Sequence, residues 1–94
     1  MKVAVYDTYV VKKNGVTMHF DIIVPDDQTH EKVLQFGLEY LKREGQAGQP
    51  LTAKECRFCH MEEASEAIEK AIKESGYYIY ELEGCHWKTP QPDL

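Results

Sequence analysis

Hydrophobic and polar positions alternate near the start of the chain, which is typical of β-strands. Residues 3–11 and 16–24 are rich in valine, tyrosine, isoleucine and threonine, and Pro25 ends the second run. Asn14-Gly15 lies between the two runs and favours a two-residue hairpin turn, because both residues tolerate positive φ. The chain is therefore predicted to open with a β-hairpin.

A two-residue turn at Asn14-Gly15 sets a register in which Asp7 faces Ile22. One face of the hairpin then carries Val3, Val5, Asp7, Tyr9 and Val11 with Met18, Phe20, Ile22 and Val24. The opposite face carries Ala4, Tyr6, Thr8 and Val10 with Thr17, His19, Asp21 and Ile23. We interpret the first face as the core face, with Asp7 as its exception.

Two later segments have the period of a helix. Residues 30–44 place apolar side chains on one stripe, follow capping side chains and end at Gly45. Residues 62–75 repeat this pattern, with acidic residues early and Gly76 at the end. The sequence therefore predicts two amphipathic helices.

The remaining segments complete an α+β fold. Residues 77–83 alternate as a last strand, while residues 55–59 form either a short strand or a metal-binding turn, of which we favour the strand. The order β-β-α-β-α-β predicts a four-stranded mixed sheet, with right-handed crossovers that place two helices on one face. We expect residues 1–86 to form a single domain and residues 87–94 a flexible C-terminal tail.

Composition narrows the class of protein. A net charge of −5, with the basic residues scattered, argues against binding to a nucleic-acid backbone. No apolar run is long enough for a signal peptide or a membrane span, so we expect a cytoplasmic protein with reduced thiols and no membrane partner. Three cysteines, an odd number, fit poorly with a disulfide scaffold.

Several stretches of the sequence resemble a family of small bacterial proteins known as a domain of unknown function. The similarity lies in residues 5–10, 19–25 and 48–60, with the closing strand in residues 76–79 and 83–85. The Cys-Arg-Phe-Cys-His motif at residues 56–60 is its most specific part. The resemblance spans about residues 1–85 and implies a compact fold of four strands and two helices. It implies no catalytic residues.

The cysteine motif is a candidate zinc site. Cys56 and Cys59 are spaced to bind one edge of a zinc tetrahedron, and Cys85 with His60 or His86 would complete it. An extended strand would instead direct Cys56 and Cys59 to opposite faces.

Two other chemistries use the same residue types. Attachment of c-type haem requires export, and no signal peptide is evident. A thiol-redox site needs a lowered thiol pKa, which the neighbouring Glu62 and Glu63 oppose. We favour the interpretation that the cysteines are small buried hydrophobic residues, and keep zinc or thiol-redox chemistry as alternatives.

Polar residues of the predicted sheet form two further candidate sites. A carboxylate on the apolar face needs a partner, and Lys54 or Arg57 could supply one to Asp7. We favour a structural role for Asp7 over a catalytic one. A second candidate is a shallow polar site on the opposite face, formed by Tyr6, His19 and Asp21. We favour the interpretation that these three residues are half-exposed residues of the sheet and do not form a site.

The opposite face also supports a hypothesis about partners. It carries Tyr6, Val10, Ile23, Tyr77 and Ile79, and would be uncovered if both helices packed on the core face. The leading hypothesis is therefore a non-enzymatic binding or interaction module that forms a homodimer. The sequence indicates neither the ligand nor a reaction.

Overall fold

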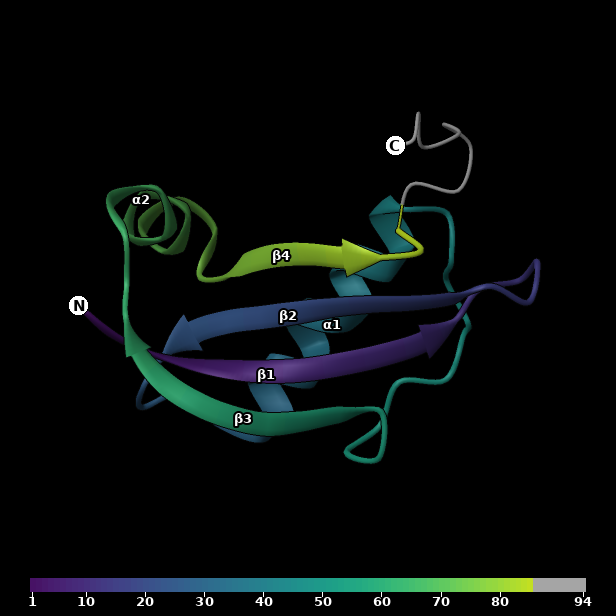
Figure 1. Cartoon of the computed structure of the whole chain (residues 1–94), viewed down its shortest axis with the longest axis horizontal. Helices are drawn as coiled ribbons and strands as arrows, with labels where there is room; N and C mark the ends of the chain where they lie inside the picture. Colours follow the sequence, from purple (N-terminus) through teal and green to yellow (C-terminus); the bar gives the residue numbers. More distant parts are fainter. Residues whose placement is uncertain (86–94) are drawn as a thin grey trace.

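The computed structural model describes residues 1–85, and these fold in the predicted order β-β-α-β-α-β (Figure 1). The elements are β1 (Lys2–Val11), β2 (Thr17–Pro25), α1 (His30–Arg43), β3 (Cys56–Glu63), α2 (Glu66–Ser75) and β4 (Tyr78–Glu83). The α+β class is confirmed. The predicted tail at residues 87–94 lies outside the described residues. Among the described helices, none has the length and apolar character needed to span a bilayer.

The strands form one sheet in the order β3-β1-β2-β4, and all three pairings are antiparallel. The prediction of a mixed sheet was wrong in this respect. A mixed sheet follows when a helix joins two neighbouring parallel strands. Here β1 lies between the strands that α1 connects, and both β1 and β2 lie between those that α2 connects. The crossovers therefore create no parallel neighbours.

The hairpin of β1 and β2 closes with a loop of three residues. The Lys12 backbone N–H donates to the Val16 carbonyl at 2.8 Å, so residues 13–15 form the turn. Gly15 has φ of +91°, the left-handed conformation that a three-residue hairpin loop requires at this position. Asp7 therefore pairs with Asp21, and the predicted register was wrong by one residue. This shift places every β1 side chain on the face opposite to the predicted one.

The main core lies between α1 and the even-numbered residues of the hairpin. Buried apolar side chains on this face are Ala4, Tyr6 and Val10 of β1 and Met18, Phe20, Ile22 and Val24 of β2. They pack with Val33, Phe36, Tyr40 and Leu41 of α1. The predicted core face was thus correct for β2 and wrong for β1.

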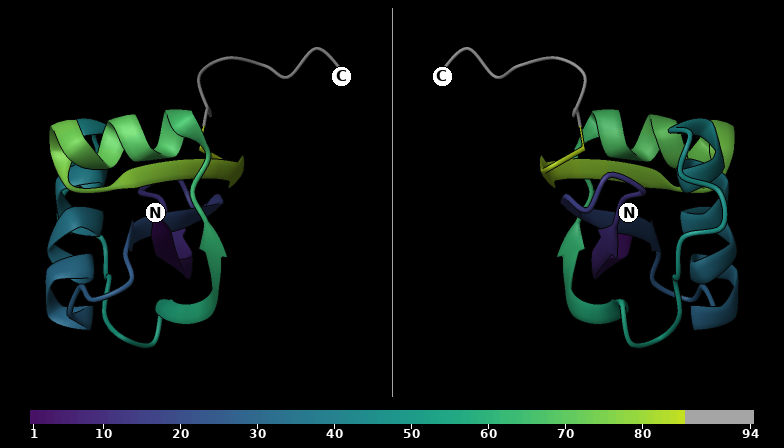
Figure 2. Two further views of the ribbon diagram at one scale, coloured as in Figure 1. Left: turned by 90° about the vertical axis from the view of Figure 1, so that its left-hand side faces the viewer. Right: turned by 90° about the vertical axis from the view of Figure 1, so that its right-hand side faces the viewer.

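Helix α2 packs on the other face, at the end of the sheet where β1 begins (Figures 1 and 2). Its Ile72 joins a second apolar cluster with Val3, Val5 and Ile23. The prediction that both helices share one face is therefore corrected. The physical reason is that the odd-numbered Val3, Val5 and Ile23 form an apolar cluster at this end of the hairpin, whereas polar side chains follow it along the same face, so α2 packs over the cluster.

Strand β3 is longer than the predicted strand at residues 55–59. Helix α2 therefore begins at Glu66, and not at residue 62 as predicted. Its pairing with β1 shifts at Cys59, because Val5 pairs with His60 while Tyr6 pairs with Phe58. A β-bulge of this kind adds one residue to a strand. Ser65 then caps α2, its Oγ accepting a hydrogen bond from an amide of the first turn.

Candidate functional site

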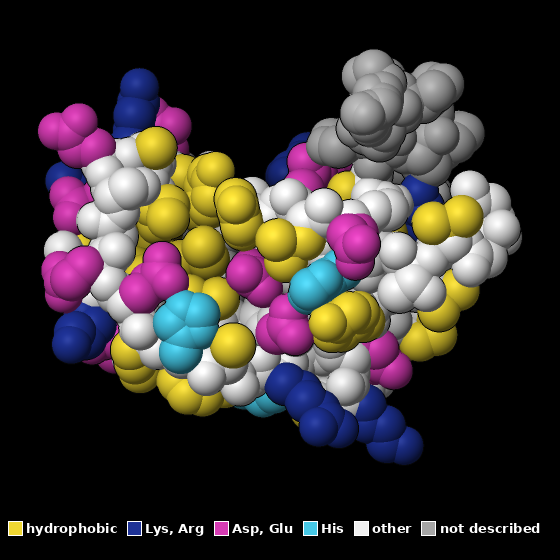
Figure 3. Space-filling model, in the orientation of Figure 1, with side chains coloured by type: hydrophobic (Ala, Val, Ile, Leu, Met, Phe, Trp, Pro, Cys, Tyr) yellow, Lys and Arg dark blue, Asp and Glu magenta, His cyan; other side chains and the backbone are white. Residues whose placement is uncertain are grey.

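Helix α2 leaves part of its sheet face uncovered, and we call this part the open face. It carries Asp7 and Tyr9 of β1, His19 and Asp21 of β2, and Tyr80 of β4. Figure 3 shows histidine and acidic side chains close together near the middle of the molecule on this side. Polar groups on adjacent strands therefore meet at one place on the sheet.

Asp7, His19 and Asp21 form a compact group. The Nε2 atom of His19 lies 2.6 Å from Oδ1 of Asp7, and Asp7 pairs directly with Asp21 across the two strands. One ligand atom from each of the three residues lies within 4.8 Å of the other two. Among residues 1–85, this is the one group of three histidine, cysteine or acidic side chains that meets this distance.

Tyr9 fixes the orientation of the His19 ring. The two rings stack with centroids 4.1 Å apart and planes 10° from parallel. This stacking directs Nε2 toward Asp7, while the side chain of His19 remains 20% exposed and that of Asp7 35% exposed. The group is therefore both oriented and open to solvent.

The pKa of Asp21 is raised to about 6. Partial burial is the largest cause, followed by the charge of Asp7 and a hydrogen bond between the two carboxyl groups. The nearby His19 and His60 oppose this shift. Two carboxyl groups held together in this way share a proton readily, and any cation placed between them would relieve their repulsion.

The group has the composition of a divalent-metal site. Imidazole nitrogen and carboxylate oxygen are ligands for zinc and for other first-row transition metals. The contact of 2.6 Å between His19 and Asp7 is a hydrogen-bond distance. Two ligands of one zinc ion lie roughly 3.3 Å apart for bonds of about 2.0–2.1 Å in a tetrahedron. A metal ion would therefore replace the proton between these side chains after a movement of less than about 1 Å.

A small cavity adjoins Asp21. It has a volume of about 170 Å³ and lies between α2 and the sheet, with Val5, Ile23, Ile68 and Tyr80 among its walls. Figure 3 shows the hydrophobic hollow beside the acidic side chains. The polar group thus lies at the border of an apolar recess.

The structure brings together three of the four predicted polar candidates. Asp7, His19 and Asp21 share the open face, although the predicted register separated Asp7 from the other two. Tyr6 lies on the opposite face, where its ring is 5.1 Å from the His30 ring. The predicted partners Lys54 and Arg57 make no ion pair with Asp7 among the described residues; its ion-pair partner is His19.

The structure does not gather the cysteine candidates into one group. Cys56 is buried in β3, and Cys59 is exposed at the bulge of the same edge strand, with Sγ 3.2 Å from Nδ1 of His60. Cys85 follows β4, the opposite edge of the sheet, and its Sγ lies 3.4 Å from the Glu83 carbonyl oxygen. His86 lies outside the described residues.

The thiols differ in environment. Burial raises the pKa of the Cys56 and Cys85 thiols, which disfavours the reactive thiolate. These two residues fit the interpretation of cysteine as a small buried hydrophobic residue, whereas the exposed Cys59 does not.

The face on which we based self-association is buried within one chain. Tyr6, Val10 and Tyr77 are at most 8% exposed beneath α1, and Ile23 is 4% exposed beside α2. The surface that the sequence predicted for a homodimer is therefore not available to a partner, and any dimer must use other residues.

The comparisons with known proteins agree with this fold. A family model described as a domain of unknown function (DUF2024) matches residues 1–82. The NMR structure of protein NE1680 from Nitrosomonas europaea is 44% identical in sequence, with a TM-score of 0.81. That similarity covers 92% of this chain and 100% of the other. No curated protein matches the chain. The chain belongs to the DUF2024 family, a domain of unknown function.

Proposed function

We propose that this protein is a non-enzymatic binding module whose open face binds a divalent transition-metal ion. Zinc is the ion that we use to test this proposal. The ligands are Asp7, His19 and Asp21. The observation that supports the proposal is the approach of one nitrogen and two carboxylate oxygens to within 4.8 Å of one another. It replaces the predicted cysteine site with a site of nitrogen and oxygen ligands.

Three features of the group favour metal binding over a purely structural role. Asp7 and Asp21 are directly paired on β1 and β2, and His19 lies two residues before Asp21 on the same face of β2, which fixes the spacing of the three side chains. Two carboxylates lie side by side, so a cation is stabilised by both. Three protein ligands leave a fourth zinc position for water or for a group of a partner, as in open zinc sites.

Zinc titration of the untagged full chain tests the proposal. Isothermal titration calorimetry should show binding of one zinc ion, and His19→Ala or Asp21→Asn should weaken it by about tenfold or more. His30→Ala is the matched control, because His30 lies on the opposite face of the sheet, where its Nε2 is 2.9 Å from the Cys56 carbonyl oxygen. Loss of binding in His30→Ala with full binding in His19→Ala would contradict the proposed site.

Self-association remains a second candidate function, now on different residues. Tyr9, Val11 and Tyr80 lie on the open face and are 48%, 52% and 52% exposed. A second copy placed there would cover these apolar surfaces.

Sedimentation at high protein concentration tests self-association, with and without zinc. A dimer weakened by Tyr80→Glu supports the open face as its interface. The control is Leu38→Glu, because Leu38 is similarly exposed, at 46%, on α1. A monomer under both conditions would rule this candidate out.

A further inference from the structure

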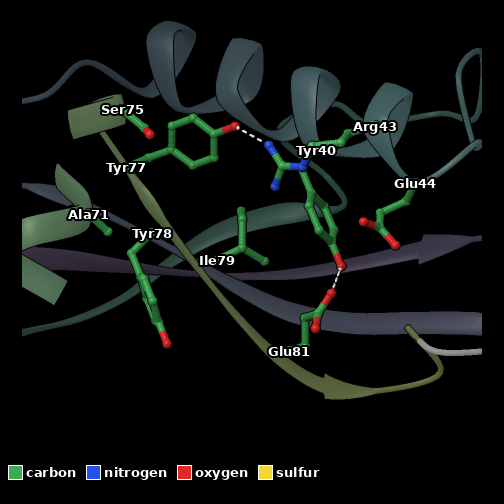
Figure 4. Close-up of a pocket in the computed structure, with 9 residues that line it drawn as sticks. All are labelled: Tyr40, Arg43, Glu44, Ala71, Ser75, Tyr77, Tyr78, Ile79 and Glu81. Atoms are coloured by element: carbon green, nitrogen blue, oxygen red, sulfur yellow. Dashed lines mark hydrogen bonds between the residues drawn. The ribbon is translucent and has the colours of Figure 1, made fainter. Parts of the chain in front are cut away.

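A second cavity lies apart from the open face. It has a volume of about 310 Å³ and is lined by residues of α1, of the last turns of α2 and of β4 (Figure 4). Cavities that bind small molecules measure roughly 300–1,000 Å³, so this one has room for a compact ligand. The charges along its wall indicate which kind of ligand it fits.

Arg43 supplies the positive charge of the cavity. Its Nη1 donates to the Tyr77 hydroxyl at 3.1 Å, and its guanidinium carbon lies 5.5 Å from the centre of the Tyr40 ring. The Tyr77 hydroxyl in turn donates to Glu39 at 2.6 Å, which fixes it as an acceptor for Arg43. The described residues give the guanidinium no ion pair with a carboxylate, so its other N–H groups are available to an anion.

Two carboxylates supply the negative charge. Glu44 follows the last turn of α1, and Glu81 of β4 accepts a hydrogen bond from the Tyr40 hydroxyl. Figure 4 shows the Tyr40 side chain between the Arg43 guanidinium and these two carboxylates. The cavity therefore has a cationic part and an anionic part rather than one uniform charge.

Apolar side chains form the rest of the wall. Ile79 and Tyr78 of β4 are half-buried, and Ala71 of α2 lies beside Tyr78. A hydrocarbon group of a ligand would cover surface that is otherwise in contact with water.

We propose that this cavity binds a small zwitterion, an α-amino acid with an apolar side chain. The carboxylate would bind Arg43, which can form two parallel hydrogen bonds with it. The ammonium group would lie toward Glu44, and the side chain would contact Ile79, which is on the same side of β4 as Tyr40. An anion alone would meet two carboxylates and a cation alone would meet Arg43, whereas a zwitterion matches both charges.

Titration of the ¹⁵N-labelled full chain with L-leucine tests this inference by NMR. Saturable shifts of amides in 77–81 and in the last turn of α1 are the expected result. N-acetyl-L-leucine lacks the ammonium charge, and L-leucinamide lacks the carboxylate. The affinity of each should be lower than that of L-leucine by about tenfold or more. The absence of shifts with tens of millimolar L-leucine, or equal binding of all three compounds, would overturn the proposal.

Two variants link the binding to the cavity. Arg43→Gln should weaken leucine binding by about tenfold, while Lys42→Gln, which removes a neighbouring exposed charge outside the cavity, should leave it unchanged. Ala71→Leu should block binding by filling the cavity, and the amide spectrum reports whether the fold is retained. Equal effects of Arg43→Gln and Lys42→Gln, or full binding in Ala71→Leu, would contradict the assignment. The open face is not involved, so zinc binding should be unaffected in these variants.

Discussion

Asp7 and Asp21 lie directly opposite each other on β1 and β2, with both side chains on the open face. Like charges at directly opposed positions of a sheet destabilise the pair. His19 compensates in part through its contact of 2.6 Å with Asp7. Burial, followed by the remaining repulsion, explains why the pKa of Asp21 is raised to about 6. The pair therefore destabilises the folded state most when both carboxyl groups are ionised.

Asp21→Asn is expected to stabilise the metal-free protein at neutral pH. A carboxyl whose pKa is raised from 3.8 to about 6 on folding favours the folded state when protonated. Its contribution is complete below about pH 4 and is lost as the pH rises through 6. Removal of the charge should raise the free energy of unfolding at pH 7.5 by about 1–2 kcal/mol, after allowance for partial exposure.

Urea unfolding at pH 5 and pH 7.5 measures this effect. The difference in stability between Asp21→Asn and the wild type should be larger at pH 7.5 than at pH 5. Asp27→Asn, at an exposed position before α1, is the control for loss of a carboxylate. A gain in Asp27→Asn equal to that in Asp21→Asn would show that general charge, not the pairing with Asp7, is responsible.

Zinc affinity should fall in acid. Protons compete with the metal for Asp21, whose pKa is about 6, so the apparent affinity should drop about tenfold between pH 7 and pH 5 through this residue. Calorimetry at the two pH values, in buffers of different ionisation enthalpy, also measures the protons released on binding. An affinity that does not change with pH would argue against Asp21 as a ligand.

The order of elements could be predicted from the sequence, but the register of the hairpin could not. Periods of two and of 3.6 residues are local properties, and they located both helices and the strands of the hairpin. Asn14-Gly15 is compatible with a two-residue turn and with the three-residue loop that closes between Lys12 and Val16. The choice between them depends on packing across the whole hairpin.

The candidate site was missed for the same reason. Asp7, His19 and Asp21 were each singled out, yet a shift of one residue placed Asp7 on the wrong face. A three-residue loop places all three residues on one face, and with that register the sequence indicates the group. The sequence separation of Cys56 and Cys85 does not indicate that Cys56 lies in one edge strand and Cys85 follows the other, because strand order depends on long-range contacts.

The three thiols should differ in reactivity. Cys59 is exposed, whereas Cys56 and Cys85 are buried and have raised pKa values, so Cys59 should react with iodoacetamide first. Mass spectrometry of the native protein should find one modified thiol, and denaturation in urea should expose all three. Rapid native labelling of Cys56 would instead favour the thiol-redox alternative.

Gly84→Ala should destabilise the protein strongly, because the backbone of Gly84 has a left-handed conformation and packs closely against β2. Its φ is +70°, and a Cβ atom there would lie 2.2 Å from the carbonyl oxygen of Thr17. The contact is with backbone of β2, which cannot move without disturbing the hairpin. We expect a loss of roughly 2–4 kcal/mol in the free energy of unfolding.

Gly48→Ala separates the two causes of this loss. Gly48 has φ of +91°, and a Cβ atom there would meet nothing within 4 Å, so only the backbone strain of about 1 kcal/mol applies. Urea unfolding of both variants gives the difference between them, which measures the contact of residue 84 with β2. Equal losses would mean that the chain after β4 is not held against Thr17. A larger loss in Gly84→Ala would establish that this contact anchors the end of β4 to the start of β2, the strand that carries His19 and Asp21.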